Sequence, residues 1–118
     1  MLINYSNFSQ GDLIIVEMHF SNQEESKLRP ALVISSNDHN QHSEDIIVLK
    51  ISSKARLRPF SVPLTQRDLS TGQLLLESVV LADFPVVILK TKVIKKIGVV
   101  NPKIISQVKE KLKLVFGI

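Results

Sequence analysis

The sequence contains no cysteine, and this absence removes several kinds of site at once. A disulfide, a thiolate nucleophile and a zinc site built on sulfur ligands are all excluded. The fold must then rest on its buried core, and 118 residues of 44% hydrophobic composition are enough to form one. We therefore expect a single domain over residues 1–118, and the lack of cysteine suits a reducing cytoplasm.

Long apolar segments and glycine-rich segments are also missing. No charge-free apolar run approaches the roughly 18 residues of a membrane-spanning helix. Residues 1–5 lack the basic start and the cleavage site of a signal peptide. These features predict a cytoplasmic protein without a membrane partner. The chain has only four glycines and no glycine-rich phosphate loop.

No group of metal ligands stands out either. His39 and His42 are close in sequence, but no third ligand accompanies them, so we expect no metal site and no cofactor. A hydrolytic triad could form only from residues that meet in space, and nothing in the sequence predicts one. What the chain does have is basic charge, since fifteen Lys and Arg against eleven Asp and Glu give a net charge of +4. That balance favours an anionic partner such as nucleic acid or an acidic protein.

The clearest local pattern lies at residues 27–36. The branched apolar run Ala31–Ile34 predicts a short strand that is buried on both faces. Pro30 has no N–H for a strand ladder, so we expect it to be the first residue of that strand and to hold Arg29 extended. Arg29 would then be a fixed cation at the edge of the core, in a good place for an anion site. The alternative is an arginine that simply ends a strand in solvent.

The remaining pattern predicts several short strands and one helix. The expected strands cover residues 11–20, 30–35, 45–52, 59–64 and 73–81, with a further apolar run at 86–89 after a bend near Asp83. The prolines of 59–64 suit an edge strand, and the polar segments 21–27, 36–44 and 65–72 are expected to be loops and turns. Asn101 and Pro102 begin an amphipathic helix whose apolar positions run to Phe116, and Gly117 ends it. The set predicts a mainly β fold, a small antiparallel barrel covered by a C-terminal helix.

Polar residues at the predicted strand ends suggest one kind of chemistry. They are Arg29, Ser52, Ser53 and Asp83, with the loop acids Glu24 and Glu25. RNA can be cleaved through its own 2′-hydroxyl without a metal ion or a protein nucleophile. Arginine suits the phosphate, because its planar fork binds two oxygens and its permanent charge stabilises the transition state. An aspartate within reach could accept the proton of the 2′-hydroxyl.

Four blocks follow one another along nearly the whole chain. They are Gly11–Ile14 with Arg29–Ser35, Leu49–Ser53 with Pro59–Val62, Val79–Pro85, and Lys95–Gly98 with the closing helix. In this order and within this length they resemble the MazF/PemK/Kid-type toxins of type II toxin–antitoxin systems.

The resemblance implies an SH3-like barrel with a C-terminal helix, the fold of the MazF, PemK and CcdB toxins, and a homodimer. It implies a metal-independent endoribonuclease that inhibits growth by cleaving single-stranded RNA at short sequences. The products would be a 2′,3′-cyclic phosphate and a 5′-hydroxyl. It also implies a cognate antitoxin whose acidic, disordered tail covers the groove, and a protein of net charge +4 is a plausible target for such a tail.

The resemblance also implies roles for residues. Arg29 matches the catalytic arginine, Ser52 the threonine that holds the phosphate, and Asp83 the proposed base of the Kid-like branch. Glu24 matches a loop acid of the family, and Ser53 belongs with it among the substrate-binding candidates.

Two positions depart from the family pattern. Leu81 stands where the Kid-like branch has an arginine, and Val86-Val87 replaces Arg-Thr. At least one phosphate-binding cation is therefore missing. The candidates to bind substrate in its place are Lys50, Lys54, Arg56 and Arg58.

Two alternatives to the ribonuclease remain open at this point. One is a non-catalytic toxin of the same fold that grips a protein target, as a DNA gyrase poison does. The other is an inactivated relative that only binds nucleic acid or a partner.

Overall fold

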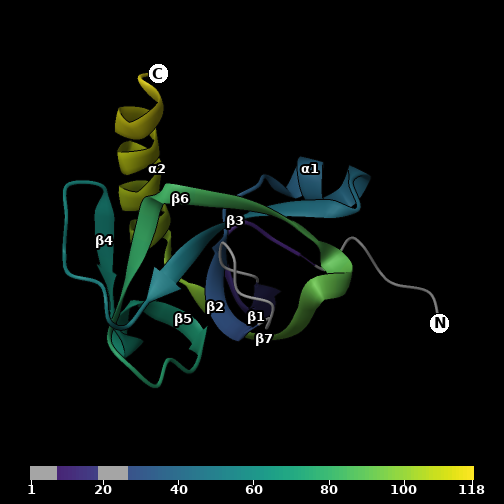
Figure 1. Ribbon diagram of the computed structural model, residues 1–118, viewed down its shortest axis with the longest axis horizontal. Coiled ribbons are helices and arrows are strands. Elements are labelled where there is room, and N and C mark those ends of the chain that lie inside the picture. The colour runs from purple at the N-terminus through teal and green to yellow at the C-terminus, as the bar shows by residue number, and fades with distance from the viewer. Residues whose placement is uncertain (1–7, 19–26) are drawn as a thin grey trace.

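The computed structural model describes residues 8–18 and 27–118, which form one curled sheet with a helix beside it (Figure 1). The elements are β1 (Asp12–Met18), β2 (Lys27–Val33), α1 (Asn37–His42), β3 (Asp45–Ser52), β4 (Ser61–Leu64), η2 (Gln66–Asp68), β5 (Leu69–Gly72), β6 (Ser78–Leu89), η3 (Lys90–Lys92), β7 (Val93–Val100) and α2 (Pro102–Phe116). Within the described chain the strand order is β4-β6-β3-β2-β1-β7-β5, and all neighbouring pairs are antiparallel. The predicted small antiparallel barrel with a C-terminal helix is confirmed.

The central strands separate two apolar clusters. The first includes Leu13 and Leu32 and is covered by Ile104 and Val108 of α2. The second takes the next residues along the same strands, among them Ile14, Val16, Ala31, Val33, Ile46 and Val48. Because successive residues of a strand point to opposite faces, β1, β2 and β3 are buried on both sides. The prediction of a strand buried on both faces is confirmed for Ala31–Val33, all of which are 0% exposed.

The prediction that Pro30 begins its strand is wrong, because β2 starts three residues earlier at Lys27. Pro30 lies opposite Ile15 of β1, but pairing with β3 begins only at Ala31. Among the described residues, the ladder between β2 and β3 therefore stops short of Pro30. A proline, which has no N–H to donate to a ladder, is tolerated there.

The prediction of a strand from residue 73 is also wrong. Residues 73–77 form a loop, and β6 begins at Ser78 and continues to Leu89 without a break. The apolar residues Leu75 and Leu76 suggested burial, yet they are 82% and 64% exposed. The bend expected near Asp83 is present as a register shift, since Val80 pairs with Ile51 and Pro85 with Leu49. The link at 65–72, expected to contain only turns, includes strand β5.

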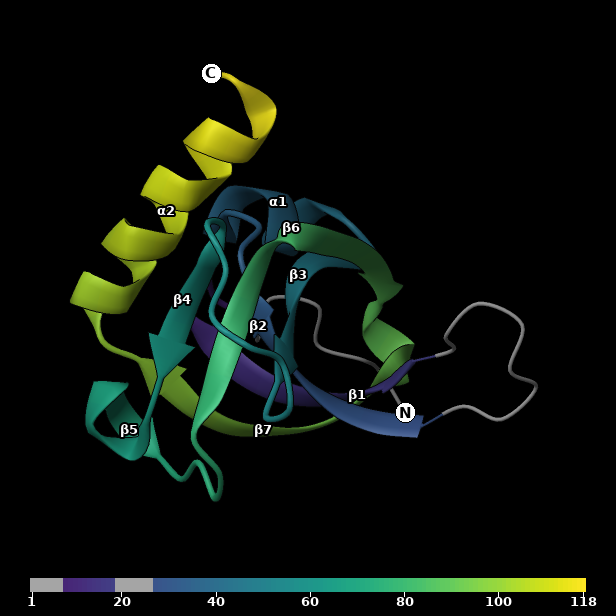
Figure 2. The ribbon, with the colours of Figure 1, turned by 60° about the vertical axis from the view of Figure 1, so that its left-hand side comes forward.

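Other expectations are confirmed at the level of single elements. Strand β3 has the predicted bounds, and β4 lies at one edge of the sheet. In α2, the Asn101 side chain accepts a hydrogen bond from the N–H of Ile104 at 3.0 Å, and Gly117 ends the helix in the left-handed conformation. Phe116 is 57% exposed, because the last turns of α2 extend beyond the sheet (Figure 2).

No helix within the described ranges is both long enough and apolar enough to cross a membrane.

Candidate functional site

A groove of about 840 Å³ runs across the sheet on the side of β2 and β7. Its lining includes residues of β2, the end of β3 and the turn that follows it. It also includes residues of β7 and residues 73–76, which precede β6. The groove therefore joins segments that are far apart in the sequence.

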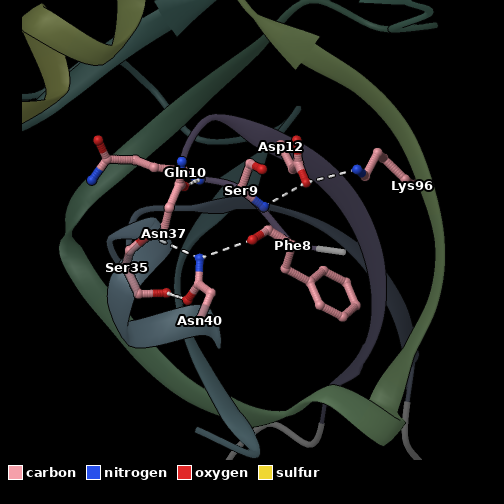
Figure 3. Close-up of polar contacts among 8 residues, drawn as sticks. All are labelled: Phe8, Ser9, Gln10, Asp12, Ser35, Asn37, Asn40 and Lys96. Atoms are coloured by element: carbon pink, nitrogen blue, oxygen red, sulfur yellow. Dashed lines mark hydrogen bonds and ion pairs between the residues drawn. The ribbon is translucent and has the colours of Figure 1, made fainter. Parts of the chain in front are cut away.

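Six basic side chains line the groove beside several apolar ones. They are Lys27, Arg29, Lys50, Lys54, Lys95 and Lys96, and no acidic residue lies among the described residues of its lining. The charge of Lys96 is balanced, since its Nζ lies 2.9 Å from Oδ2 of Asp12, a side chain that is only 3% exposed (Figure 3). The lining as a whole is positive, and a concave surface of one charge attracts ligands of the opposite charge.

Arg29 is held in the groove by the strand that carries it. It lies in β2 opposite Val16 of β1, is half-buried, and precedes Pro30, whose ring keeps the residue before it extended. Lys27 is two residues away on the same strand, so both side chains project from the same face of β2. The sequence-predicted cation at the edge of the core is therefore built into a rigid element.

Ser52 ends β3 and also shapes the turn that follows. Its Oγ accepts hydrogen bonds from the backbone N–H groups of Lys54, at 3.2 Å, and Ala55, at 3.0 Å. A hydroxyl has two acceptor positions and one hydrogen, so these two bonds leave that hydrogen to be donated. Ser53 and Lys54 lie exposed in the same turn and line the groove with Ser52.

Asp83 is not in the lining of the groove. It lies at the register shift of β6, where its Oδ1 is 2.9 Å from Nη2 of Arg58. Both side chains are partly exposed, at 44% for Arg58 and 33% for Asp83, so the pair lies at the surface. The structure thus pairs two of the predicted site residues with each other and places neither with Arg29 in the groove.

Of the remaining predicted substrate-binding residues, some line the groove and others do not. Lys50 and Lys54 line the groove, whereas Arg56 and Arg58 do not. The ammonium group of Lys50 also lies 5.0 Å from the ring centre of Phe84. Glu24 and Glu25 lie outside the described residues.

Both departures from the family pattern place apolar side chains in β6. Leu81 is 4% exposed, and Val86 packs against the second apolar cluster. Within residues 8–18 and 27–118, no group of three His, Asp or Glu side chains could hold a metal ion.

A model of the PemK-like, MazF-like toxins of type II toxin–antitoxin systems matches residues 9–116. The chain belongs to this family. No curated protein matches it in sequence.

Solved structures of MazF toxins and endoribonucleases share the fold of this toxin. A mycobacterial endoribonuclease in complex with its cognate antitoxin superposes with a TM-score of 0.77 at 20% identity, over 93% of this chain and 95% of that one. The toxin MazF-mt6 of Mycobacterium tuberculosis gives 0.75 at 20% identity, over 91% and 97%. MazF in a MazE–MazF structure from Deinococcus radiodurans gives 0.76 at 24% identity, over 93% and 96%.

Sequence reasoning missed several groove residues of this toxin. Lys27 could have been predicted, because it lies two positions before Arg29 and residues two apart in a strand share a face. Lys95 carried none, because its place depends on the pairing of β7 with β1, where it lies opposite Ile15. Residues 73–76 fall within the strand predicted at 73–81, and that prediction does not indicate their exposure beside the groove.

Proposed function

We propose that this toxin is a metal-independent endoribonuclease that cleaves single-stranded RNA lying in the groove. The observation that carries the proposal is the gathering of Arg29, Ser52 and five lysines along one concave surface with no acidic residue in its described lining. Single-stranded nucleic acid is commonly bound by such a basic groove.

In the proposed reaction, the 2′-oxygen of the RNA bonds to the adjacent phosphorus and the bond from phosphorus to the 5′-oxygen breaks. The 2′-hydroxyl loses a proton to a base, and the leaving 5′-oxygen gains one, which yields the 2′,3′-cyclic phosphate and the 5′-hydroxyl. Arg29 stabilises the charge that builds on the phosphate oxygens, and the Ser52 hydroxyl donates a hydrogen bond to one of them. Ser53 and Lys54 bind the neighbouring backbone.

The base is assigned to a carboxylate, with Asp83 and Glu24 as the two candidates. Asp83 could act only after leaving Arg58, to which it is bound in this structure. Single variants Asp83→Asn and Glu24→Gln separate the two. The one that acts as the base should lower the cleavage rate by about 10²–10⁴ at unchanged RNA affinity.

The deciding experiment is cleavage of a mixed-sequence RNA by the purified toxin, with and without EDTA, and analysis of the new ends. We expect cleavage under both conditions, and Arg29→Ala should lower its rate by about 10²–10³, the usual effect of removing a group that stabilises developing charge. Arg67→Ala is the matched control, because Arg67 is exposed and lies outside the groove. RNA that stays intact under both conditions would refute the proposed endoribonuclease activity.

The binding of RNA without cleavage is a second candidate, favoured by the Arg58–Asp83 pair, which holds the predicted base outside the groove. It predicts salt-dependent RNA binding with no new ends. A toxin that grips a protein target instead would still arrest growth after Arg29→Ala and Asp83→Asn are combined.

We also assign the toxin two protein partners. The positive groove suits the acidic tail of a cognate antitoxin, which would compete with RNA for the same cations. The family resemblance implies a second copy of the chain, and the exposed apolar residues Val87 and Leu89 of β6 offer surface for a homodimer. Light scattering of the purified toxin tests the dimer, and competition between RNA and an acidic peptide tests the tail.

A further inference from the structure

The groove has an apolar part that the proposed chemistry does not use. Residues 73–76 contribute Leu74, Leu75 and Leu76 to the lining that also holds the basic side chains. Leu74 is partly buried and packs against the first apolar cluster. Leu75 and Leu76 are 82% and 64% exposed, so they are available to a ligand in the groove.

The segment that carries these leucines is tied down at several points. The side-chain amide of Gln66 accepts a hydrogen bond from the N–H of Leu74 at 2.7 Å and donates one to the carbonyl of Gly72 at 3.1 Å. The N–H of Gln73 donates to the carbonyl of Ile97 in β7 at 3.0 Å. The Ser78 hydroxyl donates to the carbonyl of Leu76 at 2.9 Å.

The start of the segment is fixed by close backbone contact as well. Gly72 has a φ of +92°, and a Cβ there would lie 2.2 Å from the carbonyl oxygen of Ile97. Only glycine allows β5 and β7 to approach this closely. The two exposed leucines therefore project from a backbone that is ordered before any ligand binds, which lowers the entropy cost of using them as a contact surface.

A ligand that fills this groove must combine anionic groups on one side with apolar surface on the other. Single-stranded RNA has this combination, because its phosphates repeat along one edge and its unstacked bases present flat apolar faces. No aromatic side chain appears among the described residues of the lining, so the leucines are the apolar surface that the groove offers to a base.

We infer that Leu75 and Leu76 form a platform for the bases of the bound RNA, and that Gln66 is the positioning residue that holds this platform. The inference rests on the proposed RNA-binding function and names the part of the groove that contacts bases rather than phosphates. It gives Leu75 and Leu76 a part in sequence preference, since phosphate contacts carry no sequence information.

The test compares two uncleavable ligands with the full-length toxin. One is a pool of random 12-mers built on 2′-deoxyribose, which lacks the attacking hydroxyl, and the other is an abasic 12-mer with the same sugar-phosphate backbone. The unmodified toxin should bind the base-bearing pool about tenfold or more tightly than the abasic chain, because each base that packs on a leucine removes apolar surface from water. The double variant Leu75→Ala/Leu76→Ala should reduce this preference to about threefold or less, with unchanged affinity for the abasic chain.

Gln66→Ala should reduce the same preference with unchanged affinity for the abasic chain, because Gln66 is hydrogen-bonded to the backbone of residues 72 and 74 and does not line the groove with the basic side chains. Leu114→Ala is the matched control for the leucines, since Leu114 is 65% exposed on α2, and Gln41→Ala on α1 is the control for Gln66. Both controls should keep the full preference.

The outcomes separate this inference from the function on which it rests. If the toxin binds both ligands equally, or if the double variant keeps the full preference, the platform is refuted while the basic groove stands. A variant that loses affinity for both ligands in equal measure also refutes the platform. If the unmodified toxin binds neither ligand, the RNA-binding function and the platform fail together.

Discussion

At the scale of single residues, the proposed reaction divides the phosphate contacts between a permanent charge and a hydroxyl. In that proposal Arg29 supplies the charge from within a strand, and Ser52 supplies a hydrogen at the point where β3 ends. Ser52 is bound to two backbone N–H groups, so its side chain has one preferred position. The methyl group that a threonine would add is not needed to fix it, which explains how serine can serve where relatives are expected to have threonine.

The role of Ser52 is testable by two substitutions with opposite expectations. Ser52→Ala should lower kcat/KM for RNA cleavage by about 10–100-fold, because it removes a donor to the phosphate and frees the turn at Lys54. Ser52→Thr keeps the hydroxyl and should stay within about threefold of the unmodified toxin. Ser106→Ala, at an exposed position of α2, is the control. Equal rates for Ser52→Ala and the control would remove Ser52 from the site.

Lys90 provides a prediction about stability and pH. Its side chain is 3% exposed and its Nζ donates a hydrogen bond to the carbonyl of Asn40, and burial lowers the pKa of this ammonium group from its usual value of 10.5. Between the lowered pKa and 10.5 the unfolded chain binds the proton more strongly than the folded chain does. The contribution of Lys90 to the free energy of unfolding therefore rises with pH across this window.

We expect the stability of the unmodified toxin relative to Lys90→Met to increase as the pH is raised from neutral toward 10.5. Urea unfolding of both proteins at several pH values measures the difference. The comparison with Lys90→Met removes the shared effect of the other lysines. A difference that stays constant or falls with rising pH would contradict the prediction.

At the scale of elements, the sequence predicted strands well where burial and pattern agree. Residues 45–52 contain a short run of branched apolar residues with polar segments at both ends, and β3 has the expected bounds. Residues 74–76 are as apolar as a core strand, yet Leu75 and Leu76 are exposed. Local composition cannot distinguish a buried apolar strand from an exposed apolar loop. The prediction that Pro30 begins its strand failed for a related reason. Whether a strand has a neighbour on a given side is decided by residues elsewhere in the chain, and these do not appear in the local sequence.

The contact between β5 and β7 gives the prediction that belongs to this scale. Gly72→Ala should lower the free energy of unfolding by about 1–3 kcal/mol, because it adds both an unfavourable φ and a clash with the backbone of β7. Urea unfolding measures the effect. Gly117→Ala is the control, since Gly117 also has a positive φ but no atom lies within 4 Å of an added Cβ. A loss no greater than that of Gly117→Ala would show that the clash is relieved at little cost.

At the scale of the whole molecule, the position of the positive charge matters more than its total. The net charge of +4 predicted an anionic partner but could not say where it binds, because lysines lie both in the groove and along α2. The folded chain brings Lys27, Lys54 and Lys95 to one surface from three separate segments. Of the predicted site, Arg29, Ser52, Ser53 and Lys54 meet there, whereas Asp83 and Arg58 are joined elsewhere.

Two double variants of equal net charge separate these effects. Lys54→Gln/Lys95→Gln should reduce the slope of log K against log salt for the uncleavable 12-mers by about 1.4, or about 0.7 for each lost phosphate contact with a single strand. Lys103→Gln/Lys109→Gln, at exposed positions of α2, should leave the slope unchanged. Equal slopes for the two variants would mean that binding responds to net charge and not to the groove.

The strands shared by the two apolar clusters have a consequence for how the chain finds its native alignment. A shift of β1 by one residue would exchange Leu13 for Ile14 and still bury an apolar side chain on each face. Hydrophobic burial alone therefore discriminates weakly between the two registers. The pairing of β1 with β7 already contains two shifts, which adds further choices. The ion pair between Asp12 and Lys96 joins these same two strands, and its carboxylate is buried, with the Asp12 side chain only 3% exposed. A register that separated the pair would leave that carboxylate buried without its cation, so the ion pair favours the native register of β1 against β7.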